Sequence, residues 1–253
     1  MGAVISPTEK KPPPVRARRT RETGFHLTGK RTRNGESMLD KIYRSRFAPQ
    51  TLVAKRELWN TLVEDFLQKY VPKDATVADI GGGYCEFINA VECAKKYIVD
   101  LNPDIEKFAA PDVEIVMSDA NDVSPLAGSG VDVVFVSNFF EHMPTKGHLF
   151  EVLEEINRIL RPGGKLLIIQ PNIKYAYREY WDFIDHHIAL TENSLAEALG
   201  ITGFAVAECI PRFLPFSVNS SPSQSANLLK LYLKMPLAWR VFGKQTFMVG
   251  VKR

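Results

Sequence analysis

Short apolar segments alternate with amphipathic ones from residue 73 to residue 253, and this feature most constrains the fold. VDVVFVSN (131–138) and KLLIIQPN (165–172) are apolar at most positions, as expected for strands buried on both faces. Helical patterns separate such segments, including KGHLFEVLEEINRILRPGG (146–164), which closes on Pro-Gly-Gly. Strands that alternate with helices predict an α/β fold: a doubly wound, mostly parallel sheet with helices on both faces.

Seven strands are expected in this sheet, and the last should lie antiparallel beside its predecessor, because a segment containing a helix separates the two. Helices are expected over 86–96, over 191–204 with Thr191 as the N-cap, and over 225–243 with a break at Pro236. The strands are expected at TVADI (76–80), YIVD (97–100), VEIVMSD (113–119), 131–138, 165–172, AVAECIP (205–211) and QTFMVGVKR (245–253).

Charge divides the chain into a tail, 1–46, and a body, 47–253. The tail carries 12 Lys/Arg and 4 Asp/Glu, and the body carries the other 20 Lys/Arg and 25 Asp/Glu, so their balances are +8 and −5. The proline-rich tail has too little apolar content to fold alone, which predicts a solvated extension. The alternative is an electrostatic arm for nucleic acid or an anionic membrane.

Within the body, 47–72 predicts an N-terminal helix that ends at Pro72 and packs over the ligand side of the sheet core, 73–253. No apolar run approaches the roughly 18 residues that span a bilayer. The basic start lacks the apolar core of a secretory signal. Three widely spaced cysteines indicate reduced thiols rather than disulfides or a zinc site. We therefore expect a cytoplasmic protein.

The turn after the first strand, in VADIGGGYCEF (77–87), has three consecutive glycines, which predicts a ligand close against the backbone. A dinucleotide fingerprint would need glycine where Glu86 stands, and an acid beside a pyrophosphate is electrostatically unfavourable. A nicotinamide dehydrogenase is therefore the weaker interpretation. Asp79, Gly81 and Gly83 instead fit Asp-x-Gly-x-Gly, which suits a ligand without phosphates, and above all a cationic one.

This turn resembles the first motif of the class I S-adenosylmethionine-dependent methyltransferases, and the resemblance covers roughly residues 50–253. It implies that the turn passes under the methionine part and ribose of the cofactor. Asp79 would orient the turn and the cofactor's amino group, and Gly81 and Gly83 match the family's glycines. A third glycine common in the family is Cys85 here, so we expect a differently shaped turn at that point.

Features at the ends of the next three strands match the same family in the same order. Asp100, followed by Leu101, would accept hydrogen bonds from both ribose hydroxyls, a task that suits an ionised carboxylate. Asp119 would contact the adenine amino group, with Ala120 supplying backbone. Asn138 and Phe139, in VSNFFEHMP, would line the methionine side. The alternative interpretation is that Asp79, Asp100 and Asp119 are simply turn residues at strand ends.

Two clusters are candidates for activating the methyl acceptor. Glu141-His142 either acts near the methyl or supports its loop. YREYWDFIDHHIALTENSL (177–195) combines aromatics with carboxylates and imidazoles, as an acceptor pocket would. Here His186 or His187 is the expected base, helped by Asp185. Asp182, Asp185 and His186 do not have a recognised metal-ligand spacing, so no metal is expected.

The run 177–195, with the later segments PRFLPFS and LYLKMPLAWRVFGKQTFMVGVKR, resembles a bacterial subgroup of small-molecule methyltransferases associated with surface-polysaccharide or lipid-linked sugar pathways. This implies O-methylation of a sugar-like or lipid-linked acceptor. Segments 174–195 and 212–243 would be acceptor-side or cover segments. Segment 212–243 would contain a helix that covers the sheet in a monomer, or would form the contact between the two copies of a homodimer. The alternative is that it contacts a membrane surface.

Other functions remain open at this point. A nucleic-acid methyltransferase would use the basic tail, but SNFF stands where amino-directed enzymes of that kind carry Asn-Pro-Pro-Tyr, so no stable nucleic-acid partner is expected. A non-catalytic cofactor-binding partner protein would bind the cofactor without transferring its methyl group.

Overall fold

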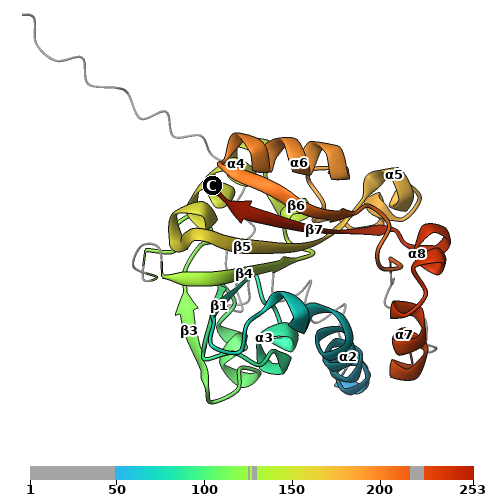
Figure 1. Cartoon of the computed structure of the whole chain (residues 1–253), viewed down its shortest axis with the longest axis horizontal. Helices are drawn as coiled ribbons and strands as arrows, with labels where there is room; N and C mark the ends of the chain where they lie inside the picture. The colour runs from blue at the N-terminus through green and yellow to red at the C-terminus, as the bar shows by residue number, and fades with distance from the viewer. Residues whose placement is uncertain (1–48, 125, 127–129, 217–224) are drawn as a thin grey trace, which may run out of the picture.

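A computed structural model describes residues 49–124, 126, 130–216 and 225–253, so the predicted tail, 1–46, lies outside the described residues. The fold is a single seven-stranded sheet in the order β3-β2-β1-β4-β5-β7-β6 (Figure 1). The neighbouring pairs from β3 to β5 are parallel. Strand β7 lies antiparallel between β5 and β6. The predicted doubly wound sheet, with its antiparallel last strand, is confirmed.

The strands are β1 (Thr76–Ile80), β2 (Lys95–Asp100), β3 (Val113–Met117), β4 (Val131–Ser137), β5 (Leu160–Pro171), β6 (Phe204–Ile210) and β7 (Gln245–Lys252). The α-helices are α2 (Pro49–Leu62), α3 (Glu86–Ala90), α4 (Lys146–Ile159), α5 (Ile173–Ala176), α6 (Glu192–Ile201), α7 (Ala226–Leu233) and α8 (Pro236–Phe242). Five short helical turns complete the described elements: η1 (Val63–Leu67), η2 (Gln68–Tyr70), η3 (Pro103–Lys107), η4 (Phe140–His142) and η5 (Tyr180–Asp182).

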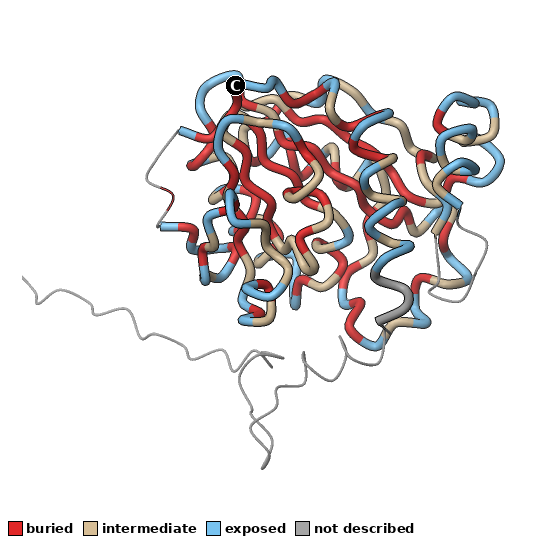
Figure 2. Tube along the Cα trace, turned by 90° about the horizontal axis from the view of Figure 1, so that it is seen from below, coloured by how far each residue is buried: buried red, intermediate tan, exposed pale blue. Residues whose placement is uncertain are grey.

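Alternate residues of the central strands face two separate apolar layers. On one face, Ala78, Val134 and Leu166 pack with residues of α4 and α6. On the other, Val77 and Phe135 pack with residues of α3, η1 and α7. The strands are therefore buried on both sides, as the tube in Figure 2 shows for the middle of the sheet. Each fully buried aliphatic or aromatic side chain contributes about 1.5–3 kcal/mol.

Helix α3 is shorter than the predicted helix 86–96. It ends at Ala90, and Val91 has extended backbone. Strand β2 then begins at Lys95, opposite Thr76 of β1, while the amides of Ala94 and Lys95 bond to the carbonyl of Ala75. The chain must return to the level at which β1 starts, so sheet pairing overrides the helical pattern of the second half of this segment.

The N-terminal helical segment runs through α2, η1 and η2 to Tyr70 and stops before Pro72. Its Phe66 ring lies 4.3 Å from Phe213 and 5.1 Å from Phe247, between ring centroids. Lys230 of α7 reaches Asp65 of the same segment at 3.5 Å. The N- and C-terminal parts of the described chain therefore cover the same face of the sheet, where α2 contacts α7 (Figure 1).

Helices α7 and α8 differ in how much apolar surface they leave exposed. Leu233 of α7 is buried, whereas no residue of α8 is. The two helices leave several large apolar side chains exposed: Leu228, Leu231, Leu237, Val241 and Phe242. Among the described residues, no helix combines the length and the apolar character that crossing a bilayer requires.

Candidate functional site

The turn after β1 is shaped by left-handed backbone and by close packing. Gly81 and Gly83 have φ angles of +68° and +55°, a region that favours glycine. A Cβ atom on Gly81 would lie 2.3 Å from Cδ2 of Phe139, and one on Gly82 would lie 2.9 Å from Oδ2 of Asp79. Neither contact is sterically allowed, so this turn requires residues without side chains.

Cys85 stands where the sequence predicted a differently shaped turn. Its φ is +63°, so its backbone adopts the left-handed conformation that a glycine would favour, at a cost of roughly 1–2 kcal/mol. The side chain is fully buried, and Sγ lies 3.9 Å from the Ile105 carbonyl oxygen. Burial, followed by the carboxylates of Asp79 and Glu86, raises the thiol pKa to about 12. This thiol is therefore structural rather than reactive.

Three carboxyl groups surround the turn. Asp79 is buried, and burial, then Glu86 and Asp100, raises its pKa well above the ordinary value. Glu86 is paired with Lys55 of α2, Nζ to Oε1 at 2.9 Å. A cationic ligand beside these carboxyl groups would oppose the rise in the Asp79 pKa, whereas a pyrophosphate would add to the repulsion that causes it.

Asp100 ends β2 beside the turn. Its Oδ2 accepts a hydrogen bond from the Gly83 amide at 3.1 Å, and its Oδ1 accepts one from the Asn102 amide at 2.9 Å. Burial raises its pKa, and these amides oppose the rise. Each oxygen keeps acceptor capacity beyond its one amide bond, so the fixed carboxylate can meet two adjacent hydroxyl groups.

Two apolar side chains are exposed at the ends of neighbouring parallel strands. Met117, opposite Asp100 in the register, and Leu101 are 47% and 43% exposed. An aromatic ring lying between these strand ends would cover both. Asp119 is exposed beside them, and Ala120 is buried. The Oδ1 of Asp119 accepts a long hydrogen bond of 3.4 Å from the Asn121 amide.

The segment after β4 connects this turn to a second group of polar side chains. Asn138 has a φ of +48°, and its backbone amide donates a hydrogen bond of 2.9 Å to the Ile169 carbonyl oxygen. Phe139 follows and packs against Gly81. The next turn, η4, carries Glu141 and His142. The sequence pattern did not predict the left-handed backbone of Asn138.

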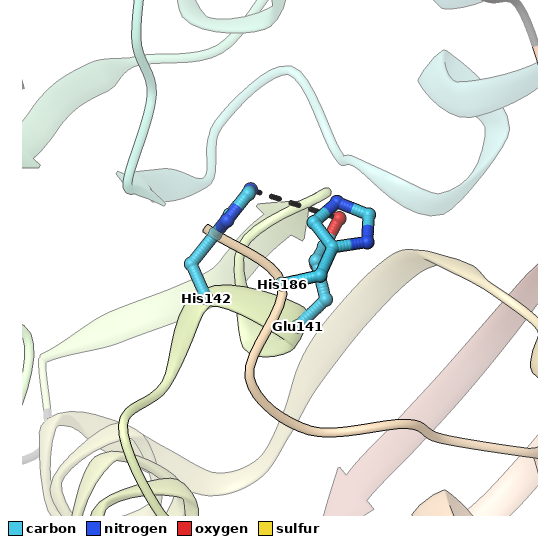
Figure 3. Close-up of side chains that lie close together, drawn as sticks. All are labelled: Glu141, His142 and His186. Carbon is cyan, nitrogen blue, oxygen red and sulfur yellow. Dashed lines mark ion pairs between the residues drawn. The ribbon is translucent and has the colours of Figure 1, made fainter. Parts of the chain in front are cut away.

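Glu141, His142, Asp185 and His186 form a cluster beyond Phe139, which we call the polar cluster. The Nδ1 atom of His142 lies 3.0 Å from the Asp185 carbonyl oxygen and 3.3 Å from Asp185 Oδ2. The Nε2 atom of His142 lies 3.9 Å from Glu141 Oε1, the pair joined by the dashed line in Figure 3. The His186 ring centroid is 5.0 Å from that of His142.

Burial distinguishes the members of the polar cluster. Glu141, Asp185 and His186 are buried, and the His142 side chain is 28% exposed. Glu141 Oε2 accepts a hydrogen bond from Gln170 Nε2 at 2.9 Å. Burial raises the pKa of Glu141, opposed by His142 and Gln170. His142 is therefore the cluster's most accessible group.

The structure places the predicted residues of segment 177–195 in two environments. Asp185 and His186 belong to the polar cluster, whereas His187 and Asp182 are exposed. Tyr177 and Trp181 are also exposed, at 60% and 57%. The pairing of His142 with Asp185 was not predicted, because 43 positions separate them. In the sequence, only the adjacent pair Glu141-His142 indicated that His142 could belong to the site.

Comparisons with known proteins agree with this arrangement. Residues 78–168 match a family model described as a methyltransferase domain. A Mycobacteroides abscessus protein described as an uncharacterized methyltransferase is 33% identical over 102 residues. That alignment covers 37% of this chain and 38% of the relative, so it spans well under half of the relative's length.

Solved structures share the fold at low sequence identity. A SAM-dependent methyltransferase from Archaeoglobus fulgidus is 22% identical with a TM-score of 0.58, covering 78% of this chain and 94% of its own. A chain from a Haloferax volcanii complex containing the Trm112 methyltransferase activator is 19% identical with a TM-score of 0.61, covering 83% and 97%.

A geranyl diphosphate C-methyltransferase from Streptomyces coelicolor, solved with Mg²⁺, geranyl diphosphate and S-adenosyl-L-homocysteine, is 12% identical with a TM-score of 0.53, covering 77% and 76%. At these identities the likeness concerns the fold, which is the Rossmann-like fold of class I methyltransferases.

Proposed function

We propose that this chain is an S-adenosylmethionine-dependent methyltransferase that methylates a hydroxyl group of a small, sugar-like acceptor. The observation that carries the proposal is the packing of Phe139 against Gly81. It joins the glycine turn, which would hold the cofactor, to the polar cluster, which would receive the acceptor. Both lie at the carboxyl ends of parallel strands, where ligands of such sheets bind.

The residues around the turn fit this cofactor. The two oxygens of Asp100, each already fixed by one amide, suit the two adjacent ribose hydroxyls. The exposed side chains of Leu101 and Met117 suit the faces of an adenine ring, with Asp119 and Ala120 at its edge. The carboxyl groups near Gly81 suit the positive charges of the sulfonium and amino groups, with Asn138 and Phe139 beside the methionine part.

When bound, the cofactor supplies an electrophilic methyl group whose carbon–sulfur bond breaks as the acceptor oxygen forms its bond to carbon, leaving a neutral thioether. The polar cluster would bind the acceptor hydroxyl and take up its proton. We assign the contact to His142, the accessible member, with Asp185 as the positioning residue that fixes its ring. The buried His186 packs against the ring of His142, and the exposed His187 is the less favoured candidate for the base.

Exposed aromatic side chains support a sugar-like acceptor. Tyr177 and Trp181 lie on the segment that leads to Asp185, and aromatic faces stack on sugar rings while carboxylates and imidazoles bind hydroxyls. A lipid-linked acceptor would add a membrane-surface role for the exposed apolar side chains of α7 and α8. Cytoplasmic location and a monomeric or homodimeric state remain predictions.

The test is transfer of a labelled methyl group from S-adenosylmethionine to a panel of nucleotide sugars and lipid-linked glycans. We expect labelled product with the wild type and at least tenfold less with Asp100→Asn at limiting cofactor. The matched control is Asp104→Asn, the same change at a half-exposed position of η3 whose side chain pairs with Lys107, which should leave transfer unchanged. Cofactor binding without transfer to any acceptor class would favour the non-catalytic alternative.

The nucleic-acid alternative depends on residues 1–46, which lie outside the described residues. Strongly salt-dependent binding of RNA or DNA, lost on deleting 1–46, would support it against the sugar-like acceptor. We expect no such binding, because SNFF stands where amino-directed nucleic-acid methyltransferases carry Asn-Pro-Pro-Tyr.

A further inference from the structure

Three side chains of the polar cluster have the composition of a metal site. Ligand atoms of Glu141, His142 and His186 all lie within 4.8 Å of one another, and the three side chains converge in Figure 3. They come from two parts of the chain, η4 after β4 and the loop before α6. The sequence predicted no metal, because Asp182, Asp185 and His186 do not have a recognised ligand spacing, and that set shares only His186 with this one.

The hydrogen bonding of His142 leaves the correct nitrogen for a metal. Nδ1 lies 3.0 Å from the carbonyl oxygen of Asp185, and a carbonyl oxygen can only accept, so Nδ1 carries the proton. In the neutral ring Nε2 then has a free lone pair. A carboxylate or carbonyl that fixes the other ring nitrogen is the usual partner of a metal-binding histidine.

Glu141 offers its second oxygen to the same point. Its Oε2 is held by Gln170 Nε2, whereas Oε1 lies 3.9 Å from Nε2 of His142. Two ligand atoms on a tetrahedral ion at about 2.1 Å are separated by about 3.4 Å, so a small side-chain adjustment would bring both within bonding distance.

The backbone holds His186 opposite this pair. The carbonyl of Glu141 accepts hydrogen bonds from the amides of His187 at 2.8 Å and Ile188 at 3.3 Å. Phe183 stacks on the His186 ring at 4.9 Å, and Tyr180 packs edge-on at 5.0 Å. These contacts fix the third ligand before any ion binds, which lowers the cost of ordering the site.

We propose that Glu141, His142 and His186 bind one divalent transition-metal ion, of the class Mn²⁺, Fe²⁺, Co²⁺ or Zn²⁺, with coordination positions left open toward the acceptor. Two imidazoles and one carboxylate favour these ions over Mg²⁺ and Ca²⁺, which prefer oxygen ligands. The role of the ion rests on the proposed function. It would bind the acceptor hydroxyl and lower its pKa, so that the hydroxyl proton leaves to solvent before methyl transfer and His142 acts as a ligand of the ion rather than as the base.

The test is titration calorimetry of the chelator-treated full chain with Zn²⁺, Co²⁺ and Mg²⁺ separately, with absorption spectra for Co²⁺. We expect one equivalent of Zn²⁺ and of Co²⁺, and at least tenfold weaker binding of Mg²⁺. Glu141→Gln, His142→Asn and His186→Asn should each weaken Zn²⁺ binding at least tenfold. His187→Asn, the same change at the exposed neighbouring histidine, should bind Zn²⁺ like the wild type.

Imidazole ¹⁵N shifts of the wild-type chain keep the test valid if a variant fails to fold, because they report directly which rings bind Zn²⁺. We expect shifts of His142 and His186 but not of His187. Absence of stoichiometric binding at about 100 µM ion, or binding that moves neither ring, would overturn the inference. S-adenosylhomocysteine binding, measured in parallel, separates this failure from failure of the proposed function.

Discussion

The two halves of the candidate site are built by different means. The cofactor half, from the turn after β1 to the end of β3, depends on backbone: left-handed glycines, an amide on each oxygen of Asp100, and adjacent strand ends. The acceptor half depends on side chains, and His142 and Asp185 meet across 43 positions. A change of backbone shape in the first half should therefore weaken cofactor binding, whereas a change of side chain in the second half should lower methyl transfer without weakening that binding.

The largest effect is expected from Gly81→Val, which alters the cofactor half and leaves the residues of the acceptor half unchanged. The new Cβ would lie 2.3 Å from Phe139 on a backbone with a φ of +68°. We expect S-adenosylhomocysteine affinity to fall at least 100-fold and the free energy of unfolding to fall by about 1–3 kcal/mol. Calorimetry and urea denaturation measure the two quantities.

Gly200→Ala is the matched control for this substitution. A Cβ atom there would meet nothing within 4 Å, and the position lies inside α6. The free energy of unfolding should rise by about 0.5–1 kcal/mol with unchanged affinity. Equal losses for the two variants would show that the turn has no special requirement for glycine.

A smaller, purely chemical effect is expected from Asp185→Asn. This change weakens the hold on His142 Nδ1, so methyl transfer should fall about 10–100-fold, while S-adenosylhomocysteine affinity stays the same. Asp182→Asn, at the exposed acid three positions earlier, is the control and should leave both quantities unchanged. A parallel loss of cofactor affinity would mean that Asp185 supports the fold and not the chemistry.

The smallest effect is expected from Cys85→Gly. Glycine removes the cost of a left-handed cysteine but also removes a buried side chain, so the free energy of unfolding should change by no more than about 1 kcal/mol. Affinity for S-adenosylhomocysteine should stay within about threefold. A tenfold change in affinity would show that the thiol itself shapes the cofactor site.

The raised pKa of the Cys85 thiol predicts that the free energy of unfolding depends on pH. The folded-state pKa of Cys85, about 12, lies above its ordinary value of 9.0. The neutral thiol therefore contributes stability that is fully present below about pH 9 and is lost as the pH rises toward 12. Urea denaturation between pH 8 and 10.5 should show a steeper loss of stability for the wild type than for Cys85→Ala.

Sequence patterns predicted the seven strands of a mostly parallel sheet, because buried strands and the turns that follow them are local features. The antiparallel β7, the N-cap of α6 at Thr191 and the break at Pro236 followed from such patterns, and all are present. The end of α3 did not follow, because the level at which β2 pairs with β1 sets it.

The cofactor half of the candidate site was likewise predictable from local features of the sequence, and the acceptor half was not. Asp79 and Asp100 lie at the carboxyl ends of the neighbouring strands β1 and β2, so their proximity could be expected from parallel pairing. The pairing of His142 with Asp185, and the approach of His186 to Glu141, depend on how the loop before α6 folds back over η4. No periodicity in the sequence encodes that contact.

The most direct test of the account is calorimetry with S-adenosylhomocysteine, and separately with NAD, on the wild type, Asp100→Asn and His142→Asn. We predict micromolar binding of S-adenosylhomocysteine, no binding of NAD, at least tenfold weaker binding to Asp100→Asn, which is a loss of about 1.4 kcal/mol or more, and unchanged binding to His142→Asn. Tight NAD binding, or S-adenosylhomocysteine binding that is absent or indifferent to Asp100, would contradict it.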